Sequence, residues 1–460
     1  MAFLPNSKVD TLSPPATAGL PPSERLSGCI QRLQSAFVAL GVAITERELG
    51  QMAKRIVRAM GGPNRNFHDL EHAFKVADGG DGLETLAALF HDVVYVQIDG
   101  DLNPEFAPLL TPFIEASGGR QMVREQIENL DDCIFALVLT IFDVQLGQHL
   151  AMEQNEFLSA LAAAKQLEDV LDVKAIAVIV ACIEATIPFR PPTPDSLTPS
   201  DLLYQKLVIA NDKFSLGWDE TYLVAVVQRA VRVSNRDVEN FASQWAADFL
   251  SNTWNLLPES NACLRDTENC TIGQYRHVLE KTASFMYYLN APLVFRQFRG
   301  EPGAVDFEGL LQQANKNLVV ARLYLNIKLL AIAILESLAH CSKGSSLEKL
   351  SQMSFVQVAK RVKQYQDTVP PDAPYRPRNL LEQEVLALLQ TGRSQPSTFD
   401  LRSSPMAAFL VKQLGMDQMV ARLDRAKALF QDNLSAKDFL SEFDPEAIAR
   451  IELMLIQACG

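Results

Sequence analysis

The amino-acid sequence predicts an all-α fold. Apolar residues recur at intervals of three and four along most of the chain, which is the spacing that gives a helix one buried face. No stretch shows sustained alternation of apolar and polar residues between turn signals, so strands are expected to be incidental at most. Because 460 residues exceed what one hydrophobic core supports, we expect helices packed in more than one domain.

The N-terminal segment predicts an arm followed by two helices. Residues 1–22 contain five prolines and no periodic pattern, and we expect them to form a flexible arm. A first helix is predicted over residues 23–41. Thr45 and Glu48 have the spacing of a capping box, which predicts a second helix that ends near Met60, before a Gly-Gly-Pro sequence.

Helical spacing continues through the rest of the chain. It predicts helices over residues 82–94, 121–144, 153–167, 172–186, 199–216, 219–232 and 234–254. A second helical block is predicted from Gln274 onward. Its longest helix, residues 306–340, is apolar over much of its circumference and should be buried on several sides. Prolines between 370 and 377 interrupt the pattern, and one later helix is predicted to start at Pro445.

Charge and cysteine content limit the classes of partner. The formal net charge of −13 argues against general affinity for nucleic-acid backbones or anionic membranes, although a local basic pocket can still bind phosphate. Seven cysteines with no Cys-x-x-Cys pattern fit a reducing cytoplasm rather than a disulfide framework. Residues 175–187 are too short to span a bilayer, and residues 318–338 are interrupted by Arg322, Asn326 and Lys328. Both stretches are expected to be core helices.

The polar residues most informative about chemistry lie in two short stretches, residues 66–76 and 86–95, which hold three of the six histidines. His68 and His72 are four apart, so on a helix they would project from one face. His91 and Asp92 end an apolar run that carries no other polar group. Placing a charged pair at the edge of a buried segment is costly unless something compensates it, and a divalent cation would.

These two stretches carry a resemblance to a known superfamily. They read Phe67-His68-Asp69-Leu70-Glu71-His72 and Leu86-Ala87-Ala88-Leu89-Phe90-His91-Asp92-Val93-Val94-Tyr95. Together they resemble the HD superfamily of metal-dependent phosphohydrolases, chiefly its small bacterial branch and more distantly the cyclic-nucleotide phosphodiesterases, whose pattern is Tyr-His-Asn-x-x-His followed by His-Asp. The resemblance continues at residues 182–186 and 210–217 and covers roughly residues 64 to 240.

The resemblance implies a domain plan and an activity. It implies an HD-type helical bundle over residues 23–255, followed by a helical domain of unknown role over residues 256–460. The implied reaction is hydrolysis of a small phosphorylated, nucleotide-like substrate by a metal-activated water. His68 matches the histidine that protonates the leaving oxygen in the phosphodiesterases. The implied metal ligands are His72, His91, Asp92 and Asp212, a mixed set that suits Mn, Fe, Ni, Co, Zn or Mg. The nearby cations expected to hold a phosphate are Arg65, Lys75 and Arg190.

Two aspartates compete for the last ligand position. Asp212 is expected to be the ligand because its branch of the superfamily has an aspartate before a Leu-Gly pair, and because it lies three residues after Ile209 on an apolar helix. Asp237 is the rival, but it lies among polar residues, where solvent or Arg236 would satisfy it without a metal.

Three other functions remain open. His68 to His72 also matches the H-x-x-E-H motif of inverzincin metallopeptidases, with Glu71 as base, but that family needs an α/β fold. A di-iron oxygenase of the HD fold would need further histidines, and between His91 and Asp212 the chain offers only His149. A regulatory or scaffolding protein would keep the metal without turnover.

The remaining histidines and the C-terminal half are expected to be structural. For His149, His277 and His340 we expect hydrogen-bonded core positions. Residues past 256 contain no motif that we can assign, so packing or formation of a homo-oligomer through the C-terminal helices is expected of them.

Overall fold

The computed structural model confirms the all-α prediction. It describes residues 21–117, 120–126, 132–150, 154–266, 269–342, 347, 353–365 and 375–459. The chain is 67% helical, and the sheet found in its described part has two strands. Residues 1–20 of the predicted arm lie outside the described residues, and its last two residues, Pro21 and Pro22, are the N-cap and the first residue of the first helix.

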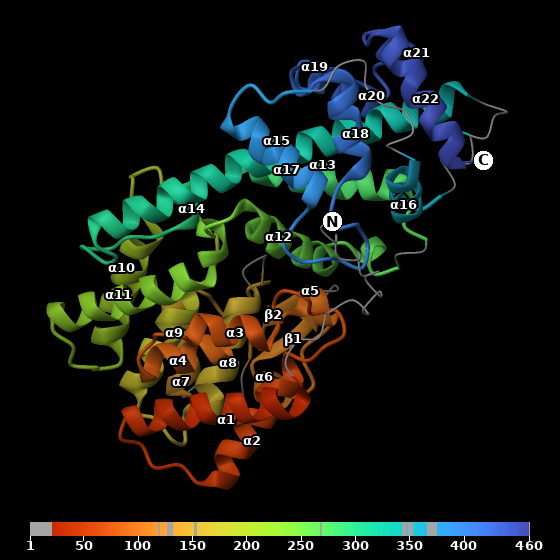
Figure 1. The fold of residues 1–460 in the computed structure, drawn as a ribbon. Helices are drawn as coiled ribbons and strands as arrows, with labels where there is room; N and C mark the ends of the chain where they lie inside the picture. The colour runs from red at the N-terminus through yellow and green to blue at the C-terminus, as the bar shows by residue number, and fades with distance from the viewer. Residues whose placement is uncertain are drawn as a thin grey trace, which may run out of the picture.

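The first half of the chain forms a bundle of helices, coloured red to yellow-green in Figure 1. Its elements are α1 (Pro22–Ala39), α2 (Glu46–Ala59), α3 (Leu70–Ala77), α4 (Gly82–Phe90), α5 (Val96–Asp99), α6 (Ala107–Leu110), β1 (Ile114–Ser117), β2 (Arg120–Val123), α7 (Cys133–Phe142), α8 (Gln154–Leu167), α9 (Val173–Ala185), α10 (Pro199–Lys213) and α11 (Glu220–Asp237). The capping box predicted at Thr45 is present, since its side chain accepts from Glu48 N and Glu48 bonds back.

The helix predicted over residues 121–144 is wrong in its first part. Residues Arg120–Val123 form β2, which pairs antiparallel with β1, and the helix begins only at Cys133 after the N-cap Asp132. Gln121 and Val123 are buried while their neighbours are more exposed. This is the two-residue period of a strand, and it is too short here to be visible as a pattern.

α11 is longer than predicted, because the sequence-based break between residues 232 and 234 does not exist. The helix runs without interruption from Glu220 to Asp237. Its buried residues include Val226, Ala230 and Val233, which follow one another at intervals of four and three. The next position on that face is Asp237. The buried face of α11 therefore ends in a carboxylate.

The second half of the chain is built around one long helix, α15, which crosses the upper part of Figure 1. Its elements are η1 (Glu239–Ala242), α12 (Ala246–Ser260), η2 (Ala262–Leu264), α13 (Ile272–Tyr288), α14 (Ala291–Val294), α15 (Ala304–Cys341), α16 (Phe355–Tyr365), α17 (Leu380–Thr391), α18 (Pro405–Leu414), α19 (Met416–Val420), α20 (Leu423–Phe430), α21 (Ala436–Leu440) and α22 (Pro445–Cys459). The helix predicted to begin at Pro445 is confirmed.

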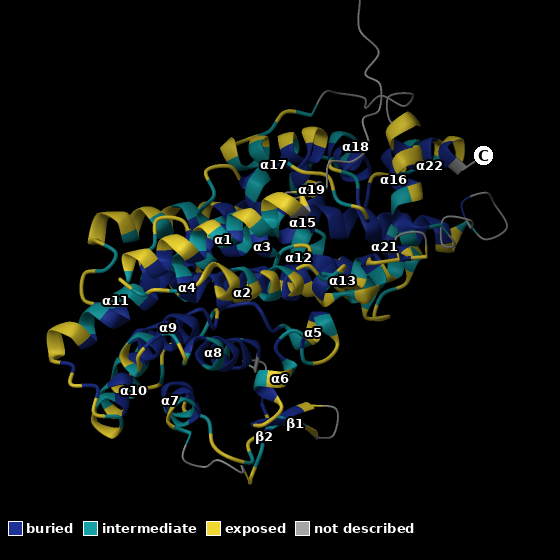
Figure 2. Cartoon of the chain, turned by 90° about the horizontal axis from the view of Figure 1, so that it is seen from below, coloured by how far each residue is buried: buried dark blue, intermediate teal, exposed yellow. Residues whose placement is uncertain are grey.

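α15 is long and apolar enough to cross a membrane, but it is enclosed by protein. Of its most apolar window, 83% is buried inside the molecule. It contacts α12, α13 and several of the helices that follow it. Figure 2 shows its middle as buried, with exposed residues on the surrounding helices. α15 is therefore the core helix that its sequence predicted.

Two hydrophobic cores divide the described chain. The first runs from Cys29 to Val233 and also takes in Phe298, and the second runs from Val238 to Leu455. α12 belongs to the second core but also contacts α5 of the first. In Figure 1 it lies between the two halves. The predicted domain boundary at residue 255 stays a prediction. The chain passes from the first hydrophobic core to the second between α11 and η1.

Within the second core, a network of buried charged residues binds α12 through Trp254. Asp400 is 1% exposed at its side chain, and one of its oxygens, Oδ2, accepts from Lys328 Nζ at 2.8 Å and from Trp254 Nε1 at 2.9 Å. Tyr275 and Arg393 also donate to it, at 2.7 and 3.3 Å. Burial alone would raise the pKa of Asp400, but the two cations outweigh burial and lower it. The carboxylate is therefore charged and holds Trp254 of α12 in place.

We expect Asp400→Ala to destabilise the protein by about 3 to 5 kcal/mol, because it leaves Lys328 and Arg393 buried without their counter-charge. Urea unfolding followed by circular dichroism measures the loss. The control is Asp424→Ala, which removes a 94% exposed partner of Lys427 and should cost less than about 1 kcal/mol. Equal effects of the two variants would contradict a stabilising role for Asp400.

Candidate metal centre

The two histidines of the first motif occupy different kinds of backbone. α3 begins at Leu70, and its N-cap Asp69 accepts a hydrogen bond from His72 N at 3.0 Å. His68 therefore precedes the helix, and the expectation that both histidines project from one helical face is wrong. Their rings are nevertheless close, with centroids 5.9 Å apart and nearly perpendicular planes. Asp69, the extended N-cap residue of α3, separates His68 from the helix, and the two rings still lie side by side.

The second motif delivers His91 at the C-terminal end of the buried helix α4. Its Nδ1 lies 2.7 Å from the carbonyl oxygen of Ala88, which can only accept, so Nδ1 carries a proton. Burial lowers the pKa of His91, but Asp92 and Asp237 outweigh burial and raise it well above its usual value, so without a metal ion Nε2 also carries a proton. A metal ion would take the place of that proton and bind the lone pair of Nε2. A backbone carbonyl that fixes the tautomer in this way is the usual partner of a metal-binding histidine.

Three side chains from three helices meet at one point. His72 Nε2 lies 2.9 Å from Asp237 Oδ1, and His91 Nε2 lies 3.3 Å from His72 Nε2 and 3.4 Å from the same carboxylate oxygen. These ligand atoms all lie within 4.8 Å of one another. Asp92 borders the group, with Oδ2 2.9 Å from His91 Nε2 and 3.7 Å from His72 Nε2. We call His72, His91, Asp92 and Asp237 the histidine-aspartate cluster.

Asp237, and not Asp212, is the distant carboxylate at this cluster. Asp212 is exposed near the end of α10, whose buried face is formed by Leu203, Leu207 and Ala210. Ile209, whose spacing to Asp212 predicted an inward-facing carboxylate, is itself 58% exposed. The expectation for Asp212 is therefore corrected, because the side chain falls on the solvent side of its helix. Asp237 continues the buried face of α11 and reaches both histidines.

The charges of the cluster suit a cation. Burial would raise the pKa of Asp237, but hydrogen bonds from His72 and His91 outweigh it and lower that pKa to about 2. The pKa of Asp92 is also lowered, since the nearby histidines outweigh its burial. Both carboxylates are therefore ionised at neutral pH. Asp92 Oδ2 is buried, and it faces His91 Nε2 at 2.9 Å without the geometry of a hydrogen bond. Two carboxylates and two imidazoles facing one point form a mixed oxygen and nitrogen set that fits a divalent metal ion.

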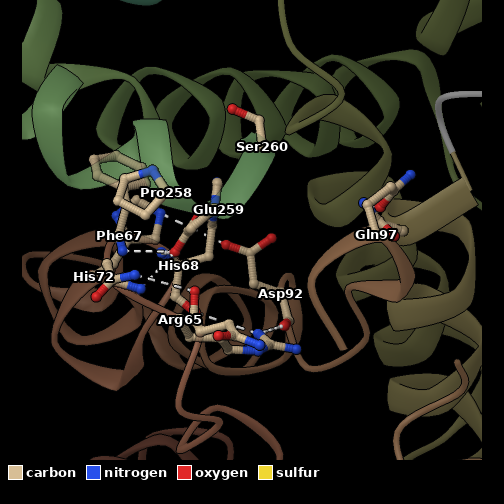
Figure 3. A network of polar contacts seen from close by, with 12 residues as sticks. Arg65, Phe67, His68, His72, Asp92, Gln97, Pro258, Glu259 and Ser260 are labelled. Carbon is tan, nitrogen blue, oxygen red and sulfur yellow. Dashed lines mark hydrogen bonds and ion pairs between the residues drawn. The ribbon is translucent and has the colours of Figure 1, made fainter. Parts of the chain in front are cut away.

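Sequence reasoning missed Glu259, which reaches the first motif from α12 (Figure 3). Its Oε1 accepts from the backbone N of Asn66 and Phe67 at 2.7 Å and of His68 at 3.1 Å. Its Oε2 lies 2.6 Å from His68 Nδ1. Glu259 is 3% exposed. The only sequence signal was a lone carboxylate that follows the apolar run Leu256-Leu257-Pro258.

Glu259 determines the charge of His68 together with the cluster. Burial lowers the pKa of His68, but the negative charges of Asp92, Glu259 and Asp237 outweigh it, so the pKa is raised. For Glu259 itself, burial raises the pKa, and the hydrogen bond with His68 and its charge outweigh that effect and lower it. These two pKa shifts favour an imidazolium on His68 and a carboxylate on Glu259. The ring of Tyr95 packs edge-on against the imidazole, with ring centroids 4.6 Å apart.

Two of the three cations expected to hold phosphate are already engaged. Arg65 is buried, and its guanidinium binds the Asp99 carboxylate at 2.8 Å and the carbonyl oxygen of Asp92 at 2.6 Å. Arg190 is bound to Glu184, at 2.8 Å between Nη1 and Oε1. Both guanidinium groups pair with protein carboxylates, and their role in binding phosphate stays a prediction. Lys75 is exposed and lines a cavity beside the cluster, so its role as a phosphate-binding residue stays a prediction.

Two cavities meet at the cluster. One has a volume of about 350 Å³ and is mainly apolar, and His68 forms part of its wall. The other has a volume of about 410 Å³, is mainly polar, and is lined by His72 and Lys75. The residues that line both cavities are Phe67, Asp237, Asn240 and Asn252. A small molecule in either cavity would therefore lie next to the cluster.

The geometry weakens two of the other functions. The H-x-x-E-H motif does not lie on one helix, because α3 starts after His68, and the described chain holds only a two-stranded antiparallel sheet instead of an α/β fold. A di-iron site would need more ligands. His149 is exposed and forms an isolated β-bridge with Met122. Among the described residues there is one group of three possible metal ligands and no second group.

Comparison with known proteins places this site in no family: no protein-family model, no curated protein and no solved structure matches the chain. The class of site therefore rests on its own residues, which define a candidate centre for one divalent metal ion.

We expect Asp237→Asn to lower metal occupancy sharply, because the substitution keeps the shape of the side chain but removes the charge that faces His72 and His91. Elemental analysis of protein purified and then loaded with Mn²⁺ or Zn²⁺ measures the occupancy. Asp212→Asn is the matched control and should leave occupancy unchanged. Metal lost from the Asp212 variant but kept by the Asp237 variant would refute the assignment.

Proposed function

We propose that the chain is a metal-dependent phosphohydrolase of the HD type, which hydrolyses a phosphoester bond in a small phosphorylated substrate. The observation that carries this proposal is the pairing of His68 with Glu259 next to a cluster able to hold a metal ion. A binding site for metal alone needs no second, separately anchored imidazole. A hydrolase needs both a cation and a proton donor for the leaving oxygen.

The cation would be held by His72, His91, Asp92 and Asp237. A divalent metal supplies a Lewis acid and lowers the pKa of a water from 15.7 to about 7. The residues of the chain do the rest. Asp92 and Asp237 bring negative charge that retains the cation and orients the two imidazoles. The ligand set does not choose between Mn, Fe, Ni, Co, Zn and Mg.

His68 is the proposed general acid. Its Nδ1 is bound by Glu259, so its ring orientation is fixed from the side of α12. Glu259 raises the pKa of His68 and so favours the protonated ring, which is the state needed to give a proton to a leaving oxygen. The same carboxylate anchors the backbone of residues 66–68, so the acid and the loop that carries it are positioned together.

Cellular location and assembly are part of this proposal. The described cysteines are all unpaired, and we propose a reducing, cytoplasmic location. A homo-oligomer formed through the C-terminal helices stays a prediction. The second core contributes Glu259 and cavity walls to the site, so its role also includes completing the site.

The first test is a screen of generic phosphomonoesters and phosphodiesters with Mn²⁺, Fe²⁺, Ni²⁺, Co²⁺, Zn²⁺ and Mg²⁺. If His68 is the acid, His68→Ala should keep the metal and lower kcat by about 10² to 10⁴. Turnover is followed by phosphate release, and metal content by elemental analysis. Loss of the metal together with activity would instead make His68 a ligand. No turnover with any metal would favour a regulatory or scaffolding role.

Glu259→Gln should shift the alkaline limb of the pH-rate profile to lower pH. Glu259 raises the pKa of His68, so removing its charge makes the imidazolium lose its proton at lower pH. The amide oxygen can still accept from the backbone, and metal content should not change. Glu280→Gln, on α13 beside Arg276, is the control and should leave the profile in place. An unshifted limb in Glu259→Gln would exclude His68 as the titrating acid.

A further inference from the structure

The apolar cavity beside His68 has no role in the chemistry proposed above. Its wall is formed by the loop after α9, η1, α12 and α13, so it lies where the two cores meet. Phe67 and Asp237 belong both to this cavity and to the polar one beside it. Its volume of about 350 Å³ falls at the lower end of the range of small-molecule pockets, which is about 300 to 1,000 Å³. One substrate molecule can therefore occupy this cavity with one part and the cluster with another.

Aromatic rings line this cavity, and one of them is held in an unusual conformation. Phe189 has φ of +55°, in the left-handed region that a bulky side chain rarely adopts. Its ring packs edge-on against Phe241 and Phe285, with centroids 5.6 and 5.4 Å apart. The neighbouring Arg190 is bound to Glu184, which holds the backbone on one side. Such strain persists only where the surroundings impose it, and it is concentrated at ligand sites.

Several polar side chains of α12 and α13 in this wall are bonded to their own helices, whereas Asn252 and Lys281 line it without such bonds. The hydroxyls of Thr253 and Thr282 donate to the carbonyl oxygens of Phe249 and Val278. The amide of Asn261 donates to Leu257 O and Ser260 Oγ. A nucleobase has several polar groups at its edges, and burying them without partners would cost affinity. Carbon surface is therefore most of what these helices offer to a ligand, with Asn252 and Lys281 as the polar side chains that can still bind one.

We propose that this cavity binds the alcohol part of the substrate, and that this part is an apolar group that carries at least one ring. The inference rests on the proposed phosphohydrolase function and names its substrate class. The phosphate then lies at the histidine-aspartate cluster, on the side of the polar cavity and Lys75. The apolar group lies against Phe189, Phe241 and Phe285. Phe189 is thus a specificity-determining residue, and an apolar ester is favoured over the nucleotide-like substrate that the sequence resemblance implies.

Phosphonates test the inference without turnover, because their carbon-phosphorus bond is not a phosphoester. Calorimetry on the full chain loaded with Mn²⁺ compares benzylphosphonate with methylphosphonate. The benzyl compound should bind at least about tenfold more tightly, since it buries a ring in the apolar cavity. In Phe189→Ala, which keeps the same backbone strain, this preference should fall at least threefold.

Two further variants show whether a loss of preference comes from the cavity wall and not from partial unfolding. Phe285→Leu keeps an apolar side chain of similar size but removes one ring of the wall, and it should also reduce the preference. Phe430→Ala, at a separate cavity near Arg276, is the control and should leave the preference unchanged. Thermal unfolding of each variant shows that it is folded.

The outcomes separate the inference from the proposed function. Equal affinities of the two phosphonates, or binding of neither, would overturn the apolar site. A preference that both Phe189→Ala and Phe285→Leu leave intact would overturn it too. Tighter binding of a nucleoside phosphonate than of benzylphosphonate would overturn it as well. A benzyl preference that depends on Phe189, combined with no turnover of any phosphoester, would support the apolar site and sink the proposed phosphohydrolase.

Discussion

The site depends on one buried carboxylate, that of Glu259. It accepts three backbone hydrogen bonds from residues 66–68 and holds the ring of His68. Burying an ionised carboxylate is costly unless it is fully hydrogen-bonded, and four donors satisfy this one. Without it, three backbone N–H groups before α3 would lack that partner and the loop that carries His68 would have no anchor on α12. The first motif therefore has its observed shape only against the second core.

This contact gives the C-terminal half of the chain a place in the site. α12 carries both Trp254, which binds the buried Asp400, and Glu259, which binds His68. The charge network around Lys328 and Asp400 therefore fixes the helix that positions the proposed acid. The same helix lines both cavities beside the cluster. A separate N-terminal domain would have the histidines and Asp237 but would lack the carboxylate that orients His68.

Arg65, a buried cation beside the site, is compensated by protein groups. Arg65 is satisfied by Asp99 and by the carbonyl oxygens of His68 and Asp92, so it braces the two motifs against each other. In the cluster, by contrast, Asp92 Oδ2 faces His91 Nε2 at 2.9 Å without a hydrogen bond, and two imidazole nitrogens face each other at 3.3 Å. Positive charge at that point would satisfy all of these groups together. The geometry of the cluster thus favours a cation more strongly than any one of its residues does.

Local spacing in the sequence determined the helical class, most helix starts and the placement of His72, His91 and Asp92. These features depend on neighbours within a few residues, such as the capping box at Thr45 and the apolar run that ends at Phe90. Asp237 and Glu259 lie 165 and 191 residues from the histidines that they bind, so no local pattern could assign them. The preference for Asp212 failed because an apolar helix does not reveal which side faces solvent until its neighbours are in place. Only the tertiary structure decided which carboxylates reach the histidines, because helix packing brings them together.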